Sequence, residues 1–184
     1  MVNENKEKHI VKDRWYGMRK GRTPKKREFA GKPQFTLEDL YISPLAFRRR
    51  YTEDGVVEYI PVEREMSPSG VEVMDAYLRR LTAGDSNLGK FCERYGARTG
   101  DMDSLCFLLT GMPGAEFRLR YMVRLADDLL RYTSMTLDEV ARRSGHGKRV
   151  NLFFAYKRDY GISPLERRCQ LRASPADEGR FRVE

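Results

Sequence analysis

The side chains of this sequence that could do chemistry are mainly lysines and arginines gathered near its two ends. Residues 1–34 hold 11 basic and 4 acidic side chains, and residues 133–184 hold 11 and 7, whereas the middle of the chain has no excess of positive charge. The densest run contains Arg19, Lys20, Arg22, Lys25, Lys26 and Arg27. Clustered cations bind phosphate groups and release counterions from a polyanion, so the pattern favours a nucleic-acid partner. Charge that serves only solubility is the alternative.

Residue types that carry catalysis are scarce. The two histidines, His9 and His146, fall in the basic arm and in an expected turn, without a serine or cysteine partner at motif spacing. The sequence has no P-loop, no GxGxxG after a strand and no HExxH. Asp127 and Asp128 are neighbours on an expected helix and point in diverging directions, which indicates surface charge rather than a metal pair. We therefore expect no enzyme activity, no metal and no cofactor.

Composition places the chain among folded proteins without membrane segments. Its 184 residues, 40% hydrophobic and 11% aromatic, are enough for one large domain or two small ones. The three cysteines are an odd number without CxxC spacing, which argues against a disulfide scaffold and a structural zinc site. No apolar run approaches the roughly 18 residues of a membrane helix, and the N-terminus has no signal peptide pattern. We expect a soluble, cytoplasmic protein.

Turn-forming residues and changes in charge divide the chain into four expected segments. Glycines and prolines among the charges of the first segment favour an extended arm over a helix. In the second segment, a helix is expected to start at Ser43-Pro44, a short strand to cover Val56–Val62, and another helix to open at Ser67-Pro68. The expected organisation is a basic arm (1–34), a small mixed α/β extension (35–84), a helical domain (85–172) and a loose tail (173–184).

Helical signals are dense from about residue 86, and they repeat. Lys90–Gly96 aligns with Glu139–Gly145 at an offset of 49, and Leu109–Phe117 aligns with Asp159–Arg167 at an offset of 50. Each unit has a short helix, a glycine turn and a longer helix that ends at a glycine, which is the pattern of a helix-turn-helix motif. A long helix over about 114–132 joins the two units. Capping boxes open two later helices, at Thr136–Glu139 and Ser163–Glu166.

Two helix-turn-helix units joined by one long helix resemble the DNA-binding domain of the AraC family of bacterial transcription regulators. The most specific matches are Thr136–Gly145, Leu152, Tyr156-Lys157, Gly161–Pro164, Leu109–Pro113 and Leu125–Thr133. The resemblance covers roughly residues 85–170. It implies a mainly α fold, in which two helix-turn-helix subdomains are joined by a long linker helix and preceded by the basic arm and the small mixed α/β extension.

The resemblance also implies a partner and a mode of binding. In this family the second helix of each unit enters the major groove of double-stranded DNA, and the two insertions lie about one turn apart on the same face. The protein would then be a cytoplasmic bacterial regulator that is associated with the nucleoid when bound. Residues 1–84 are too short and too charged for the sensory barrel of larger family members, so no small-molecule effector is expected.

In the second unit, the resemblance makes residues 148–158 the recognition helix. Lys148 and Arg149 then lie at the end where side chains reach base edges. Arg149 can bridge guanine O6 and N7, and Asn151 can pair with adenine N6 and N7. His146, in the preceding turn, replaces a usual aromatic residue and is interpreted as a packing substitute rather than a catalyst.

The rest of this helix divides into core and surface. Two residues are expected in the core, Leu152 and Tyr156. Phe153 and Phe154 cannot both be buried beside Leu152, so at least one is expected to face thymine methyl groups or a protein partner. Phosphate contacts are expected from Lys157 and Arg158, for which solvated surface charge is the alternative.

The recognition helix of the first unit, expected over residues 100–109, departs from the family. It carries Asp101 and Asp103 on its groove-facing side and has no Lys or Arg. Carboxylates brought near phosphates repel DNA, although a carboxylate can also accept a hydrogen bond from cytosine N4. Three interpretations remain: a unit kept for folding without groove contact, an acidic reader of cytosine, or a surface around Phe107–Leu109 that contacts a second copy or another protein.

Two functions from different classes follow from these observations. The first is a DNA-binding transcription regulator whose second unit reads the major groove. Its basic arm would contact phosphates or the minor groove, in the manner of arms built on Gly-Arg-Pro. The alternative is an interaction or architectural module with a degenerate first unit, which docks on a protein and binds DNA without sequence preference.

Overall fold

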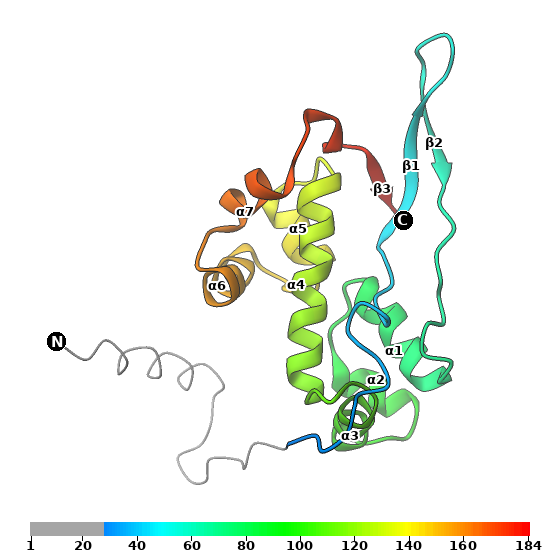
Figure 1. Cartoon of the computed structure of the whole chain (residues 1–184), viewed down its shortest axis with the longest axis vertical. Coiled ribbons are helices and arrows are strands. Elements are labelled where there is room, and N and C mark those ends of the chain that lie inside the picture. The colour runs from blue at the N-terminus through cyan, green and yellow to red at the C-terminus, as the bar shows by residue number, and fades with distance from the viewer. Residues whose placement is uncertain (1–27) are drawn as a thin grey trace, which may run out of the picture.

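The computed structural model describes residues 28–184, which form seven α-helices and one small antiparallel sheet (Figure 1). The sheet has the order β2-β1-β3 and consists of β1 (Leu45–Tyr51), β2 (Val57–Pro61) and β3 (Phe181–Val183). The helices are α1 (Glu72–Thr82), α2 (Leu88–Arg94), α3 (Thr99–Thr110), α4 (Gly114–Tyr132), α5 (Leu137–Arg143), α6 (Arg149–Tyr160) and α7 (Pro164–Leu171). A short 3-10 helix covers Pro175–Asp177. None of the helices in this part of the chain combines the length and the apolar character needed to cross a membrane.

Two hydrophobic cores lie along α4, which runs through the middle of the molecule (Figure 1). The first core joins α1, α2, α3 and the first half of α4. The second joins the other half of α4 to α5 and α6. The α4 side chains in the first core come mainly from its N-terminal half, and those in the second core come from its C-terminal half. One helix thus holds both helix-turn-helix units.

The internal repeat of the sequence is present in the structure, and the expected double helix-turn-helix fold is confirmed. The bounds of α2 and α5 differ by 49 positions, and those of α3 and α6 by 50. The extra residue lies in the second turn, which covers residues 144–148 against 95–98 in the first. Gly111 and Gly161 end the two longer helices with left-handed φ angles of 69° and 72°. Both expected capping boxes form, at Thr136 and Ser163.

Residues before position 84 share the first core with the residues that follow it. Leu40 and Ile42 are buried there beside the apolar face of α1. The Ile42 amide donates to the Tyr121 hydroxyl over 3.0 Å, and that hydroxyl also lies 2.8 Å from Thr82 Oγ1. A side chain of α4 therefore fixes both the loop before the sheet and the end of α1.

Two expectations for the segment before α2 are wrong. The helix expected at Ser43-Pro44 is strand β1, because this stretch pairs with β2 on one side and β3 on the other. The helix expected to open at Ser67-Pro68 begins later, since Ser69 instead donates to Asp75 from its amide and its hydroxyl. Sheet pairing and a local turn override the Ser-Pro signal in these two places. The strand expected over Val56–Val62 is confirmed as β2.

The loose tail expected over residues 173–184 is also wrong. Its last residues form β3 on the edge of β1, and Phe181 packs edge-on against Tyr132 of α4 at 5.4 Å between ring centroids. Asp177 is buried and accepts from the Ala173 amide at 3.2 Å. Tyr59 donates its hydroxyl to the Gly179 carbonyl. The chain end thereby ties the sheet to α4, on the side of α4 away from α6 (Figure 1).

The two helix-turn-helix units touch each other through the loop after α1. Ser86 donates its hydroxyl to the Gly145 carbonyl over 3.1 Å, and Arg118 of α4 donates to the Ser86 carbonyl over 3.1 Å. Gly84 has a φ of 84°, and a Cβ at this position would lie 2.7 Å from the Arg143 carbonyl oxygen. Only glycine permits this close approach of the loop to the end of α5.

We predict that Gly84→Ala lowers the free energy of unfolding by about 2–4 kcal/mol, because it adds a backbone clash to the cost of a left-handed alanine. Gly55→Ala is the matched control: its φ is 76°, but no atom lies within 4 Å of the added Cβ. That control should lose only about 1 kcal/mol. Urea unfolding of the two variants measures the difference. Equal losses of unfolding free energy would show that the contact between the Gly84 loop and the end of α5 does not hold the two units together.

Candidate nucleic-acid interface

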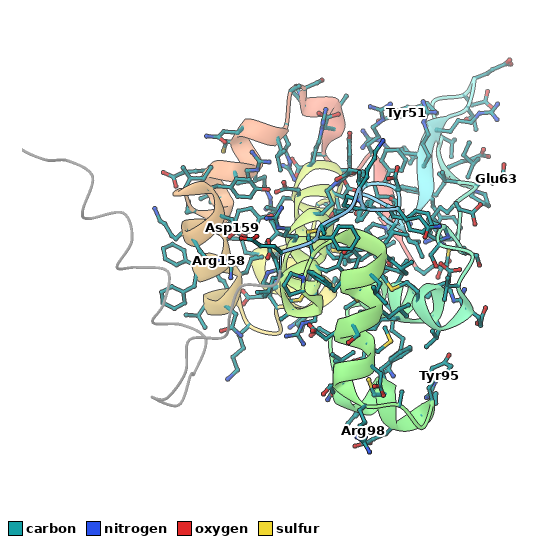
Figure 2. All side chains as sticks on the ribbon, turned by 60° about the horizontal axis from the view of Figure 1, so that its bottom comes forward. Tyr51, Glu63, Tyr95, Arg98, Arg158 and Asp159 are labelled. Carbon is teal, nitrogen blue, oxygen red and sulfur yellow. The ribbon has the colours of Figure 1, made fainter. Side chains whose placement is uncertain are left out.

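The second helix-turn-helix unit presents one face of α6 to solvent. Arg149, Val150, Phe153, Phe154 and Lys157 follow one another on this face at helical spacing, and all are exposed. The opposite face is buried and contains Leu152, Ala155 and Tyr156. Figure 2 shows side chains of α6, the helix with the labelled Arg158 and Asp159, projecting away from the body of the molecule. The core positions expected for this helix are confirmed, and so is the expectation that at least one phenylalanine is exposed, since both are.

A buried carboxylate on α4 fixes the orientation of α6. Asp127 accepts from the Tyr156 hydroxyl at 2.8 Å and from the Tyr160 hydroxyl at 3.0 Å. Arg167 of α7 donates to the same carboxylate through two nitrogens, at 3.2 and 2.8 Å. Burial and the charge of Asp127 raise the pKa of Tyr156 above its ordinary value. The same two causes raise the pKa of Tyr160 to about 12. Both tyrosines therefore stay protonated and continue to donate to the carboxylate.

Asp128, the neighbour of Asp127, points toward the segment that precedes the sheet. It accepts from the Tyr41 hydroxyl at 2.8 Å and pairs with Arg124, which also contacts Glu38. Burial and the Asp128 charge hold the pKa of Tyr41 well above its usual value. The prediction of surface charge is therefore wrong for both aspartates, whereas their divergent directions are as expected. In residues 28–184, no group of three or more His, Cys, Asp or Glu side chains is arranged to hold a metal ion.

The turn before α6 is built around a buried histidine. Ser144 gives its single hydroxyl hydrogen to the Val140 carbonyl, so the contact at 2.8 Å between Ser144 Oγ and His146 Nδ1 requires the hydrogen on Nδ1. His146 Nε2 is buried and has no hydrogen-bond partner within the described part of the chain. Burial, and next the charge of Arg158, lower the pKa of His146 to about 4. His146 thus packs as a neutral ring, as expected.

The expected base-contacting residues lie at the start of α6. Lys148 is the residue before the helix and Arg149 its first residue, and both are exposed. Within residues 28–184, no hydrogen bond or ion pair holds either side chain. Asn151, by contrast, donates its side-chain amide to the His146 carbonyl at 2.9 Å. For a contact with adenine, the Asn151 side chain therefore has its second N–H and its carbonyl oxygen.

The expected phosphate-contacting residues follow on the last turns of α6. Lys157 lies with its ammonium 5.8 Å from the centre of the Phe153 ring and 3.4 Å from the Gly161 carbonyl oxygen. Arg158 forms two hydrogen bonds with Asp159, at 2.6 and 2.8 Å (Figure 2). A phosphate at this position would have to compete with the Asp159 carboxylate. The six basic residues expected to contact DNA from the arm lie outside the described residues: Arg19, Lys20, Arg22, Lys25, Lys26 and Arg27.

In the first unit, the two acidic side chains of α3 have internal partners. Asp101 accepts from the Arg98 amide at 2.8 Å and so caps its own helix. Asp103 accepts from the Gly114 amide at 2.8 Å, at the start of α4. Asp101 is exposed, whereas Asp103 is half-buried and one of its carboxylate oxygens satisfies a backbone donor of the next helix.

The chain that precedes the sheet lies along α3. Phe29 packs edge-on against Phe107 at 5.5 Å between ring centroids. The Phe35 amide donates to the Leu109 carbonyl at 3.0 Å, and the Pro33 side chain lies against Gly111. Phe107 corresponds to Lys157 in the repeat, so the chain itself covers part of the helix face that α6 leaves open. No local sequence signal indicated this contact, because Phe29 directly follows a run of charged residues and has no periodic apolar partner nearby.

We predict that protonation of His146 destabilises the fold. Its folded pKa of about 4 lies below the ordinary value of 6.5, so the unfolded chain takes up the proton first as the pH falls. The contribution of His146 to the free energy of unfolding is therefore fully present above pH 6.5. It falls by about 3 kcal/mol as the pH declines to 4. Urea unfolding at several pH values should show a flatter profile for His146→Phe, which keeps the ring without the titration. Parallel profiles for the two proteins would contradict the prediction.

Comparisons with known proteins agree with the fold. No protein-family model matches the chain, and no curated protein matches its sequence. The C-terminal domain of AraT, a response regulator from Geobacillus stearothermophilus, is similar over 60% of this chain and 92% of that domain, with a TM-score of 0.51 and 19% identity. The DNA-binding domain of AdpA, solved with a target DNA, has 27% identity and a TM-score of 0.48 over 55% and 91% of the two chains. An AraC-type regulator from Chromobacterium violaceum has 20% identity and a TM-score of 0.44 over 54% and 89%. The chain thus shares the fold of the AraT domain.

Proposed function

We propose that this protein is a DNA-binding transcription regulator of the AraC type and that α6 is its recognition helix. The observation that carries this proposal is the outward face of α6, which begins with two exposed cations and stands on a helix fixed from behind by Asp127. A rigidly held helix that begins with exposed cations can enter a major groove without rearrangement. The proposed role is binding, without a catalytic step or a cofactor, in the bacterial cytoplasm.

The proposed contacts divide into base readout and backbone contact. Arg149 would bridge guanine O6 and N7, with Lys148 beside it at the helix start. Lys157 and Arg158 would contact phosphates that border the groove. Asn151 would reach adenine only with the part of its amide that does not hold the turn. Specificity therefore depends mainly on the first turn of α6.

The first unit would contribute little to base readout. Helix α3 has no Lys or Arg, and its Phe107 is in contact with Phe29. Residues 28–35 run along this helix, so the basic arm of the sequence joins the body beside the first unit. The cations of the arm would supply, through phosphate or minor-groove contacts, the attraction to DNA that α3 lacks.

A second function is favoured by one observation on α3. Leu108 is 66% exposed and lies about two turns after Asp101, the acidic residue at the helix start. Such a surface suits a protein partner or a second copy better than a phosphate backbone. In that case the chain would be an architectural or interaction module that binds DNA without sequence preference.

We predict that Arg149→Ala weakens binding to the preferred duplex by about 1–3 kcal/mol and relaxes the preference at one base pair. The preferred duplex is first obtained by selection from random sequences, and affinities are measured by fluorescence anisotropy. Arg142→Ala is the matched control, since Arg142 is an exposed arginine on α5 of the same unit. Uniform weakening on all duplexes would make Arg149 a phosphate contact. Equal affinity of the unaltered protein for selected and random duplexes would favour the second function.

We also predict that the arm determines much of the salt dependence. Replacing its six basic residues between positions 19 and 27 by Gln should make the plot of log affinity against log salt shallower, by about 0.9 per phosphate contact removed. The preference between selected and random duplexes should stay nearly unchanged, because phosphate contacts carry little sequence information. An unchanged slope would place the arm away from DNA.

A further inference from the structure

The outward face of α6 contains an apolar patch, which consists of Val150, Phe153 and Phe154. Their exposed fractions are 51%, 39% and 46%, and the two rings meet edge to face with 5.9 Å between centroids. The three side chains lie one turn or less apart, so they form one continuous surface on the helix. Hydrogen-bonded base readout uses polar side chains, and this surface has none in its centre.

The fold does not require apolar residues at these positions. The core side of α6 is already closed by Leu152 and Tyr156, each 0% exposed. In the first unit, the equivalent positions on α3 hold Gly100, Asp103 and Ser104. The same helix packing thus forms with small or polar residues, so packing within the fold does not account for the exposed apolar side chains on α6.

Cations border the patch on both ends. Arg149 precedes it along the helix, and the Lys157 ammonium lies 5.8 Å from the centre of the Phe153 ring. An apolar centre between positive ends is complementary to a groove with apolar groups on its floor and phosphates on its walls. A protein partner with the same complementarity would need an acidic rim around an apolar surface.

We propose that α6 selects thymine, through contact of Phe153 and Phe154 with C5 methyl groups in the major groove. This inference rests on the proposed DNA-binding function and specifies what its recognition helix reads. The C5 methyl of thymine is the apolar group that base pairs present on this groove edge. Removing one methyl from contact with an aromatic ring is expected to weaken binding roughly fourfold, from the transfer free energy of a buried carbon.

The test replaces thymine by deoxyuridine in the selected duplex, one position at a time. Uracil keeps every hydrogen-bonding group of thymine and lacks only the methyl, so the substitution isolates the apolar contact. With the full chain, deoxyuridine opposite α6 should weaken binding roughly fourfold per contacted methyl. Deoxyuridine at thymines outside the protected site is the control and should leave the affinity unchanged.

Variants assign the effect to the patch. Phe153→Ala and Phe154→Ala should bind thymine and uracil duplexes with similar affinity, whereas Phe153→Leu should retain part of the difference. Because both phenylalanines are exposed, these variants are expected to fold, and thermal melting followed by circular dichroism checks this. Arg149→Ala should keep the difference between thymine and uracil while binding both duplexes more weakly.

The outcomes separate this inference from the function on which it rests. If the protein prefers its selected duplex but no deoxyuridine substitution weakens binding, thymine selection is wrong and the DNA-binding function stands. If selected and random duplexes bind equally, the proposed function itself fails. If the Phe→Ala variants bind DNA normally but lose self-association in sedimentation, the patch is a protein interface and the thymine proposal is overturned.

Discussion

The direction of α6, the proposed recognition helix, depends on one buried side chain, the carboxylate of Asp127. A carboxylate removed from water is stable only when charged and hydrogen-bonding partners replace the solvent, and here they come from α6 and α7. Because Tyr156, Tyr160 and Arg167 all converge on a side chain of α4, neither helix can rotate without leaving that charge unpaired. The outward face of α6, and so every proposed base contact, is set by this requirement.

The repeat explains why α3 has an acid at a position where α6 has an aromatic ring. Asp103 and Phe153 are equivalent at the offset of 50, as are Gly114 and Pro164. Gly114 has a backbone N–H at the start of α4, and Asp103 accepts from it. Pro164 has no N–H, and Ser163 caps α7 instead. Position 153 therefore has no backbone donor to satisfy, and a polar side chain is not required there.

Features that depend on residues close together in the sequence could be predicted, whereas features that depend on residues far apart in the chain could not. The helices of residues 85–172 were predictable because caps, glycines and apolar spacing are local signals. Strands β1 and β3 pair across about 130 positions of chain, and no local pattern indicated that pairing. The burial of Asp127 depends in the same way on Arg167, 40 residues away. The contact between Phe29 and Phe107 of α3 likewise joins residues that are far apart in the sequence.

The acidic start of α3 has less effect on DNA than its charge suggests. Asp103 faces α4, which leaves Asp101 as the exposed carboxylate of this helix. Asp101 caps the helix N-terminus, where the amide dipoles offset part of its charge. A duplex near α3 would therefore meet weak repulsion from Asp101 and a single cation at the helix start, Arg98, which corresponds to Lys148 in the repeat. In the proposed function, the arm adds to this attraction. Sequence preference would then reside in α6 alone, and affinity would come from contacts on both units.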